Sequence, residues 1–299
     1  MAAAEQMTTK PGAVSQPQAH RRRVSIGTRI GQVAGYTAMI GVVIIIGLPL
    51  FWLISAAFKE TREIYIIPTT WIPREPTLQN FPRAWAAAPF GLYYFNTTLV
   101  TVVSVFGKLV MGATTAYALV MLRFPGKNIV FALILGALMI PAQVVVVPNY
   151  LLFADLGLVN TYAGLIIPHI PTAVGTFLLR QAFMAIPREI LDAARVDGAS
   201  HLRTLWMIMI PLSMPVLVTF GLIATQDVWN DFLWPLVITN TQNMRTLPVG
   251  IFTLLDQEGN TQWGVVMAGA IYVMAPLLIV FVWAQRHIVE GIAAGAVKG

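Results

Sequence analysis

Six apolar segments, each long enough to cross a lipid bilayer, constrain the fold of this 299-residue chain more than any other feature. A transmembrane helix needs about 20 mainly apolar residues to cross roughly 30 Å of hydrocarbon. Only 11% of the residues are charged, whereas soluble domains carry about 25%. The apolar segments are residues 33–58, 92–122, 129–153, 162–183, 205–238 and 265–285. We therefore predict an all-α integral membrane protein with six transmembrane helices.

Proline interrupts every predicted span except the second. It occurs at Pro49 in the first span, for example, and at Pro211 and Pro215 in the fifth. Broken helices are tolerated in membranes where neighbouring protein or a water-filled path satisfies the freed backbone groups. This pattern is typical of a transport pathway.

The polar ends of the chain set the domain organisation. Residues 1–30 are rich in Ala, Gln, Thr and Pro and read as a disordered cytoplasmic tail, residues 31–292 as the six-span domain, and residues 293–299 as a C-terminal tail. The basic run Arg21–Arg23 before an apolar segment also suits a cleaved signal peptide. The apolar run that follows is too long for that, which favours an uncleaved first span.

Basic residues orient the chain. With the N-terminus inside, the inner segments hold thirteen Lys and Arg residues and the outer segments five. The inner residues are Lys10, Arg21, Arg22, Arg23, Arg29, Arg123, Lys127, Arg180, Arg188, Arg195, Arg203, Arg286 and Lys298, and the outer ones are Lys59, Arg62, Arg74, Arg83 and Arg245. The positive-inside rule predicts that both termini are cytoplasmic.

Several functional classes are disfavoured. The chain has no cysteine, which excludes disulfides and thiolate chemistry. The basic residues flank the spans instead of forming one patch, so the net charge of +6 does not indicate nucleic-acid binding. His169 is isolated and is better read as structural than as a metal ligand. No phosphate-binding glycine loop is present, so this chain cannot itself hydrolyse ATP.

A short polar helix is predicted between the fourth and fifth spans, over residues 186–199. Pro187 suits the first helical position, and Glu189 and Asp192 place negative charge where the helix dipole favours it. Gly198 suits the left-handed residue that ends a helix, and Ser200 can cap the next one. A protein that only sits in a bilayer has little use for such an element.

This stretch resembles the EAA loop of bacterial ABC-importer permeases. The family pattern is Glu-Ala-Ala, three residues, Gly, nine residues, Ile-x-Leu-Pro, and the chain departs from it only with Asp192 for Glu and Ile210 for Leu. In that family the helix docks into a cleft of the ATPase subunit. The resemblance assigns ATPase coupling to Glu189, Asp192, Ala193, Ala194, Asp197 and Gly198. An ordinary cytoplasmic loop is the alternative.

The wider resemblance covers nearly all of residues 30–292. Residues 95–98, 123–126 and 229–236 are similar to permeases of the carbohydrate-uptake, MalG-type branch, which share the MetI-like fold. Residues 107–108, 176–184 and 258–263 look closer to the sn-glycerol-3-phosphate permeases of that branch. The resemblance implies an importer of glycerol-3-phosphate or glycerophosphodiesters, with neutral sugars or oligosaccharides as the alternative.

The same resemblance implies a set of partners in the bacterial plasma (inner) membrane. These are a second permease subunit that completes a heterodimer, two ATPase subunits and an extracytoplasmic solute-binding protein. No cofactor is expected in this chain, because ATP and Mg would be bound by the ATPase subunits. Besides these partners, the chain contacts membrane lipid, and no nucleic acid is expected.

Lys108 lies near the middle of the second span. An ammonium at membrane depth is costly unless it faces water or a counter-charge. It is therefore a candidate binding point for an anionic or polyhydroxylated solute. A structural ion pair or a side chain that reaches to the interface would also explain it.

A polar cluster lies in the fifth span. Asp227 and Asp231 are spaced i, i+4, which would place them on one helix face. Together with Gln226 and Asn230 they could bind hydroxyl groups, while Trp229 and Trp234 could stack on a sugar ring. An ion pair between Asp231 and Lys108, or a polar network that fixes the fold, are alternatives. Two weaker candidates are Asn96 and Gln143.

Two other functional classes stay open. An ion-coupled secondary transporter would use Asp227 or Asp231 as a proton carrier, but would not need the short polar helix. An intramembrane enzyme would use the two aspartates as a catalytic pair, but catalytic partners usually converge from separate elements. The sequence thus favours the permease subunit of an ATP-driven importer.

Overall fold

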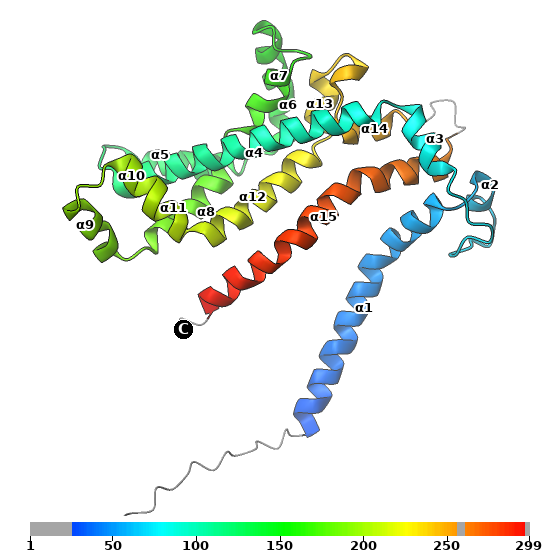
Figure 1. Ribbon diagram of the computed structural model, residues 1–299, viewed down its shortest axis with the longest axis horizontal. Helices are drawn as coiled ribbons and strands as arrows, with labels where there is room; N and C mark the ends of the chain where they lie inside the picture. Colours follow the sequence, from blue (N-terminus) through cyan, green and yellow to red (C-terminus); the bar gives the residue numbers. More distant parts are fainter. Residues whose placement is uncertain (1–25, 256–260, 297–299) are drawn as a thin grey trace, which may run out of the picture. The chain divides into compact units, whose positions relative to one another are not determined.

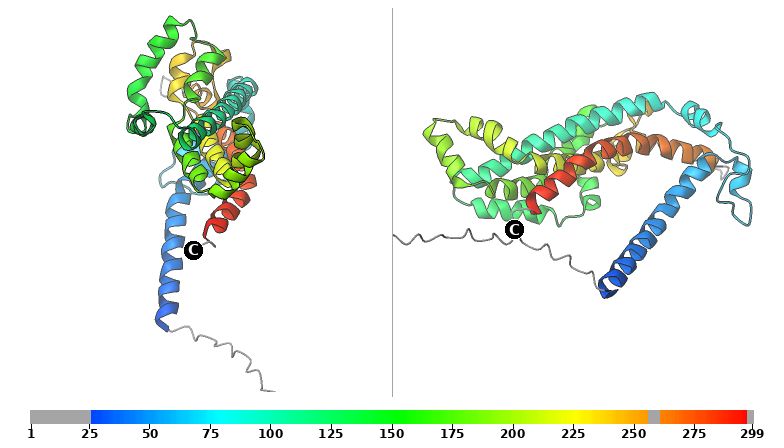
Figure 2. Two further views of the ribbon diagram at one scale, coloured as in Figure 1. Left: turned by 90° about the vertical axis from the view of Figure 1, so that its left-hand side faces the viewer. Right: turned by 60° about the horizontal axis from the view of Figure 1, so that its bottom comes forward.

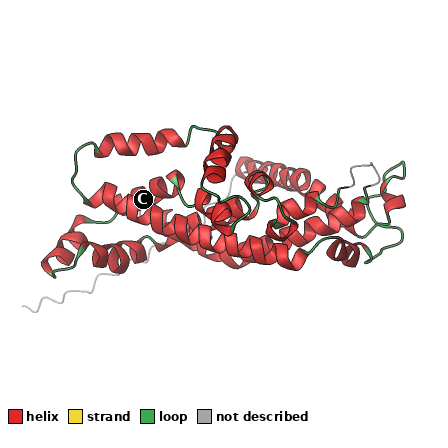
Figure 3. Ribbon diagram, turned by 90° about the horizontal axis from the view of Figure 1, so that it is seen from above, coloured by secondary structure: helices red, strands yellow, loops and turns green. Residues whose placement is uncertain are grey.

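The computed structural model describes residues 26–255 and 261–296, and all regular elements of this part are helices (Figure 3). The chain divides into two compact units, one ending at Phe51 and the other beginning at Trp52. Helix α1 (Ile26–Ala57) continues through Pro49. The N-terminal tail was predicted to extend to residue 30, but its last five residues, 26–30, are the start of this helix. Residues 1–25 lie outside the described part.

Within residues 26–255 and 261–296, three uninterrupted helices are long and apolar enough to cross a membrane. They are α1, α4 (Phe90–Met121) and α15 (Trp263–Ala296). Helix α15 continues to Ala296, so residues 293–296 of the predicted C-terminal tail are helical, while residues 297–299 lie outside the described part. The first, second and sixth predicted spans are confirmed as continuous helices.

The third, fourth and fifth predicted spans are each bent pairs of helices. Helix α5 (Lys127–Ala137) meets α6 (Ala142–Asp155) at 101°. The short elements α7 (Tyr162–Ile166) and η1 (Ile167–His169) meet α8 (Ala173–Met184) at 43°. Three short elements follow one another over residues 201–212: α10 (His201–Thr204), the π-helix η2 (Leu205–Met209) and α11 (Ile210–Leu212). Together they meet α12 (Met214–Trp229) at 83°. The described part thus has six candidate membrane segments if each bent pair counts as one span.

Proline explains where these breaks fall. Pro141, Pro171 and Pro215 each lie at a break, because proline has no N–H to donate and its ring clashes with the preceding turn. The fifth predicted span also stops short of residue 238, since α12 ends at Trp229 and a separate α13 (Leu233–Ile238) follows. Proline does not break every helix, as Pro276 lies inside the continuous α15.

The segments between the spans pack onto the span ends. Helices α2 (Thr61–Ile64) and α3 (Asn80–Ala87) follow α1, and η3 (Gln242–Met244) and α14 (Leu247–Phe252) follow α13. The buried Asn80 amide donates to the carbonyls of Ala57 and Lys59, at 2.9 and 2.7 Å. The Leu247 N–H donates to the Thr97 hydroxyl of α4 at 2.8 Å. These segments are therefore parts of the fold and not simple solvated loops.

Helices α4, α8 and α12 lie side by side and form the largest core of the second unit (Figures 1 and 2). Small residues on α4, such as Ala113 and Ala116, let the other two helices approach closely. A Cβ built on Gly175 of α8 would lie 2.3 Å from the buried Phe220 ring of α12, and one on Gly112 would lie 3.3 Å from the Gly175 backbone. Glycine is thus required at Gly175 by close packing.

Gly175→Ala should lower the thermal stability of the purified protein. The added methyl group would overpack the junction of α8 and α12, at a cost of about 1–3 kcal/mol. The matched control is Gly136→Ala in α5, where a Cβ meets no atom within 4 Å. That control should be neutral or slightly stabilising, because alanine favours helix by about 1 kcal/mol over glycine. Equal melting temperatures for the two variants in detergent would contradict this packing argument.

Candidate functional site

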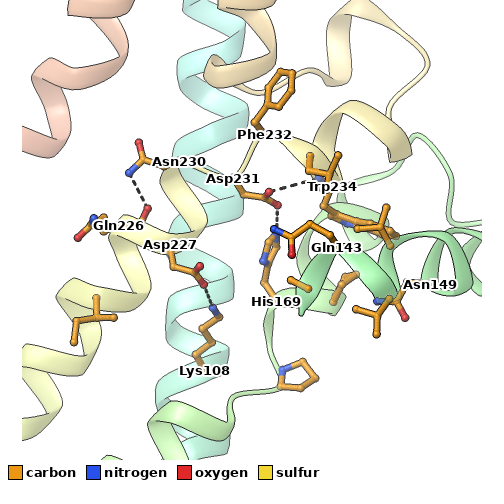
Figure 4. A pocket seen from close by; sticks show the side chains of 17 residues that line it. Lys108, Gln143, Asn149, His169, Gln226, Asp227, Asn230, Asp231, Phe232 and Trp234 are labelled. Atoms are coloured by element: carbon orange, nitrogen blue, oxygen red, sulfur yellow. Dashed lines mark hydrogen bonds and ion pairs between the residues drawn. The ribbon is translucent and has the colours of Figure 1, made fainter. Parts of the chain in front are cut away.

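A pocket of about 810 Å³ opens where α4, α6, η1, α12 and α13 meet (Figure 4). Its lining combines charged and amide side chains with apolar and aromatic ones. The seventeen lining residues are Lys108, Ala142, Gln143, Val145, Val146, Asn149, Pro168, His169, Pro171, Ile223, Gln226, Asp227, Asn230, Asp231, Phe232, Leu233 and Trp234. Most of the predicted pathway residues, which are distant in sequence, are thereby brought to one place.

Lys108 is buried in α4, and its ammonium donates a hydrogen bond to Asp227 Oδ2 of α12 at 2.6 Å. The lysine side chain is 9% exposed, whereas the aspartate side chain is 64% exposed. A buried ammonium requires such a counter-charge, because its desolvation is otherwise too costly. The alternative that Lys108 pairs with Asp231 is therefore wrong, and the partner is Asp227.

Asp231 does not share a helix face with Asp227. Helix α12 ends at Trp229 with Asn230 as its C-cap, so Asp231 lies in the link to α13. The physical reason is Pro235, whose ring would clash with the Asp231 carbonyl if one helix ran through both residues. The link nevertheless turns the Asp231 carboxylate toward the pocket (Figure 4), so both carboxylates line it from separate elements.

The Asp231 carboxylate lies beside the His169 imidazole in the lining of the pocket. Asp231 Oδ2 lies 3.3 Å from His169 Nε2, an ion-pair distance if the imidazole is protonated, although the two groups are not aligned for a hydrogen bond. The Trp234 backbone N–H also points to Asp231 Oδ1, at 3.5 Å. His169 is thus a neighbour of a carboxylate. Among the described residues no three His, Cys, Asp or Glu side chains converge to hold a metal ion.

Amide side chains supply the neutral polar part of the lining. Gln143 and Asn149 lie on α6, and Gln226 and Asn230 at the end of α12. Asn230 Nδ2 donates to the Gln226 carbonyl at 2.9 Å. An amide can both donate and accept hydrogen bonds, which suits hydroxyl groups. Sequence reasoning missed Asn149 and Phe232, and the signal for Asn149 was a polar residue inside the apolar third segment.

Two predicted pathway residues lie outside the pocket. Asn96 is fully buried; its amide nitrogen donates to the Asn243 and Arg245 carbonyls at 2.8 and 2.9 Å, and its oxygen accepts from Tyr162. Trp229 is buried and donates to the Val273 carbonyl at 3.0 Å. Both fix the packing of neighbouring segments, and neither lines the pocket. Trp234 does line the pocket, while its indole N–H is bound to the Gly164 carbonyl at 2.9 Å.

The predicted short polar helix is α9 (Arg188–Val196). It ends in a Schellman motif, in which the Ala199 N–H donates to the Ala194 carbonyl and the Gly198 N–H to the Arg195 carbonyl. Gly198 has a φ of +73°, as the sequence predicts. Ser200 caps α10 by accepting the Arg203 N–H at 3.3 Å.

Helix α9 has a buried and an exposed face. Leu191 and Ala194 are buried, which anchors the helix to the rest of the fold. Of the residues assigned to coupling, Glu189, Asp192, Ala193, Asp197 and Gly198 are exposed and Ala194 is not. An Arg195–Asp192 ion pair of 2.9 Å joins two exposed side chains of the helix. The exposed face is free to meet a partner.

A pocket at the junction of broken membrane helices, combined with a short exposed helix between two spans, is the arrangement expected of a transport subunit. The family model "Binding-protein-dependent transport system inner membrane component" matches residues 108–293. The chain belongs to this family, the MetI-like permeases of ABC importers.

Curated relatives agree with this assignment. The chain is 37% identical over 261 residues to the sn-glycerol-3-phosphate transport system permease protein UgpE of Yersinia enterocolitica, covering 85% of this chain and 92% of the relative. It is 36% identical over 256 residues to the arabinooligosaccharides transport system permease protein AraQ of Halalkalibacterium halodurans, covering 84% and 91%. It is 34% identical over 278 residues to the probable ABC transporter permease protein YurM of Bacillus subtilis, covering 90% of each chain.

Solved structures share the fold. A bacterial ABC transporter that imports the acidic polysaccharide alginate matches with a TM-score of 0.77 and 24% identity, covering 88% of this chain and 98% of that one. The alginate transporter in complex with its pentasaccharide-bound periplasmic protein matches with a TM-score of 0.64 and 16% identity, covering 87% and 96%. These matches confirm the predicted fold class.

Asp227→Asn should destabilise the permease, because it leaves the buried Lys108 ammonium without its counter-charge. The expected loss is roughly 1.5–3 kcal/mol, the range for a hydrogen bond to a charged group. Adding Lys108→Gln should restore much of the melting temperature. The matched control is Asp227→Asn with Asp231→Asn, which still leaves the buried Lys108 ammonium without its partner and should give no rescue. Equal rescue by both double variants, measured by thermal unfolding in detergent, would contradict the pairing.

Proposed function

We propose that this chain is one permease subunit of an ATP-driven importer that takes up a polyhydroxylated solute of the sugar or oligosaccharide class. A second permease subunit would complete the pathway, and an extracytoplasmic binding protein would deliver the solute. Two ATPase subunits would bind ATP and Mg and perform the hydrolysis. The balance of basic residues supports cytoplasmic termini and a cytoplasmic α9.

The composition of the pocket is the observation that carries the substrate class. It holds one ammonium, two carboxylates and the His169 imidazole. Its remaining polar groups are the four amides, which pair well with hydroxyl groups. The Phe232 and Trp234 side chains complete the lining, although Trp234 is buried and offers little ring surface to a solute. A neutral polyol can use the amides without disturbing the Lys108–Asp227 pair.

Glycerol-3-phosphate or a glycerophosphodiester is the second candidate. Lys108 lies in the pocket, and a phosphate could take over its ammonium from Asp227. That exchange would place a phosphate beside two carboxylates, which is electrostatically unfavourable. The relatives do not separate the candidates, since the identities to the glycerol-phosphate and oligosaccharide permeases are 37% and 36%.

Uptake by the complete importer in proteoliposomes tests the substrate class. Neutral oligosaccharides should be accumulated, and excess glycerol-3-phosphate should not compete with them. Asn230→Ala and Gln143→Ala should each reduce uptake several-fold, because each removes a hydrogen-bonding group from the pocket. Gln181→Ala, an exposed amide of α8 outside the pocket, is the matched control. Accumulation of glycerol-3-phosphate alone would support the second candidate and contradict the first.

The connections of α9 support its coupling role. Helix α8 runs into α9 from the η1 segment that carries His169, and α10 to α12 lead from α9 to Asp227. Both α8 and α12 pack against α4, which carries Lys108. A rigid-body movement of α9 on an ATPase subunit would therefore be transmitted along two helices to opposite walls of the pocket. Such rocking is one form of alternating access.

Gly198→Val should uncouple the importer while the spans still insert. A Cβ at Gly198 meets no atom within 4 Å, so the cost is conformational and arises from the positive φ. For a β-branched residue this region costs at least about 1–2 kcal/mol, which would reshape the turn and the exit angle of α9. Gly198→Asn is the matched control, because asparagine tolerates this conformation. Co-purification of the ATPase subunits and solute-stimulated ATP hydrolysis are the measurements; unchanged coupling in Gly198→Val would refute the role.

A further inference from the structure

A second pocket, of about 660 Å³, lies where the end of α4 meets the start of α5, the end of α8 and helix α9. Among its charged lining residues five are cationic and Asp192 is the single acid. The cations are Arg123, Lys127, Arg180, Arg188 and Arg195. Such a concentration of positive charge attracts an anion, and the solute pocket described above does not include it.

The cations retain free hydrogen-bonding capacity. The Lys127 ammonium donates to the Val120 and Leu122 carbonyls at 3.3 and 3.1 Å, which leaves one of its three N–H bonds. The Arg180 guanidinium lies 4.1 Å from the centre of the Phe131 ring, and its Nε is buried without a hydrogen-bond partner among the described residues. Only Arg195 pairs with the acid, Asp192, at 2.9 Å. An anionic oxygen in the pocket would satisfy the donors that remain.

Two helix N-termini add to the positive potential. Helix α5 has eleven residues and α9 has nine, and no side chain caps either N-terminus. Lys127, Asn128 and Arg188, from the first turns of these helices, line the pocket. Uncapped N–H groups and the helix dipole favour a bound anion such as phosphate.

An apolar strip leads away from the pocket along α5. Ile129 and Leu133 are 67% and 70% exposed and are spaced i, i+4 on one face of the helix. Met184, which lines the pocket, is also exposed. Charged groups are costly within the hydrocarbon, so the cationic pocket marks the membrane–water boundary and the strip beyond it faces acyl chains.

We propose that this pocket binds the phosphate headgroup of an anionic phospholipid, whose acyl chains lie along α5. Basic pockets between membrane helices are suited to such headgroups. The lipid would touch α4, α5, α8 and the base of α9 together, so it would brace α9 against the span ends. The apolar strip distinguishes a lipid from an acidic segment of the ATPase, which would need the cations alone.

Lipid binding to the importer, purified in detergent and depleted of lipid, tests the proposal. Phosphatidylglycerol should bind and raise the melting temperature, whereas phosphatidylcholine and inorganic phosphate should not match it. Arg123→Gln combined with Arg188→Gln should weaken phosphatidylglycerol binding by about fivefold for each charge removed, as expected for basic residues at an anionic surface. Both side chains are exposed, so the variant should fold. Arg203→Gln, an exposed basic residue outside the pocket, is the control.

Leu133→Gln in the strip should also weaken phosphatidylglycerol binding without changing the charge. Unchanged phosphatidylglycerol binding in the Arg123 and Arg188 double variant would overturn the proposal. Inorganic phosphate binding as tightly as the lipid would overturn the assignment of acyl chains to α5. Loss of ATPase co-purification with full lipid binding would assign the pocket to the ATPase instead.

Discussion

The close approach of α4, α8 and α12 is the constraint on which the rest of the second unit depends. Gly175 and the small residues of α4 permit it, and no side chain at Gly175 would fit beside Phe220. Lys108 of α4 is buried beside the pocket. A buried ammonium then needs a carboxylate within reach, and Asp227 of α12 provides it at 2.6 Å. Apolar packing and the ion pair therefore favour the same arrangement of α4 and α12.

Breaks in the surrounding helices give this rigid centre its function. At the break after η1, and at the link between α12 and α13, the chain brings His169 and Asp231 to the pocket from two directions. Backbone that leaves a helix at membrane depth must find other partners; at the α12–α13 link the Asn230 and Asp231 N–H groups donate to the Gln226 and Val228 carbonyls, and the Trp234 N–H points to Asp231 Oδ1. The indole N–H groups of Trp229 and Trp234 bind the Val273 carbonyl of α15 and the Gly164 carbonyl of α7, which fixes the link to neighbouring helices.

Hydropathy, caps and proline positions predicted the six membrane segments, the α9 helix and its Gly198 terminus, because each follows from local chemistry. The sequence did not predict which spans are bent, because a proline does not always break a helix: Pro276 lies inside the continuous α15, while Pro141 lies at a bend of 101°. Neighbouring helices decide which outcome occurs. The partner of Lys108 also escaped prediction, because a continuous helix makes Asp227 and Asp231 equivalent. Asn96 shows a further limit: a polar residue in an apolar segment signals burial with partners, but its sequence position cannot say whether these are solute or backbone carbonyls.

The two pockets contain similar cations yet suit different ligands. In the pocket of Lys108 the single ammonium is already paired with Asp227, and Asp231 adds a second carboxylate. A phosphate must therefore displace Asp227 before it can bind the ammonium. In the pocket beside α9 the cations exceed the acids, and two helix N-termini add to the positive potential. The affinity of a site for anions is therefore set by the counter-charges around its lysines and arginines. For this permease, that argument separates a neutral polyol in the pathway from an anionic lipid at the membrane surface.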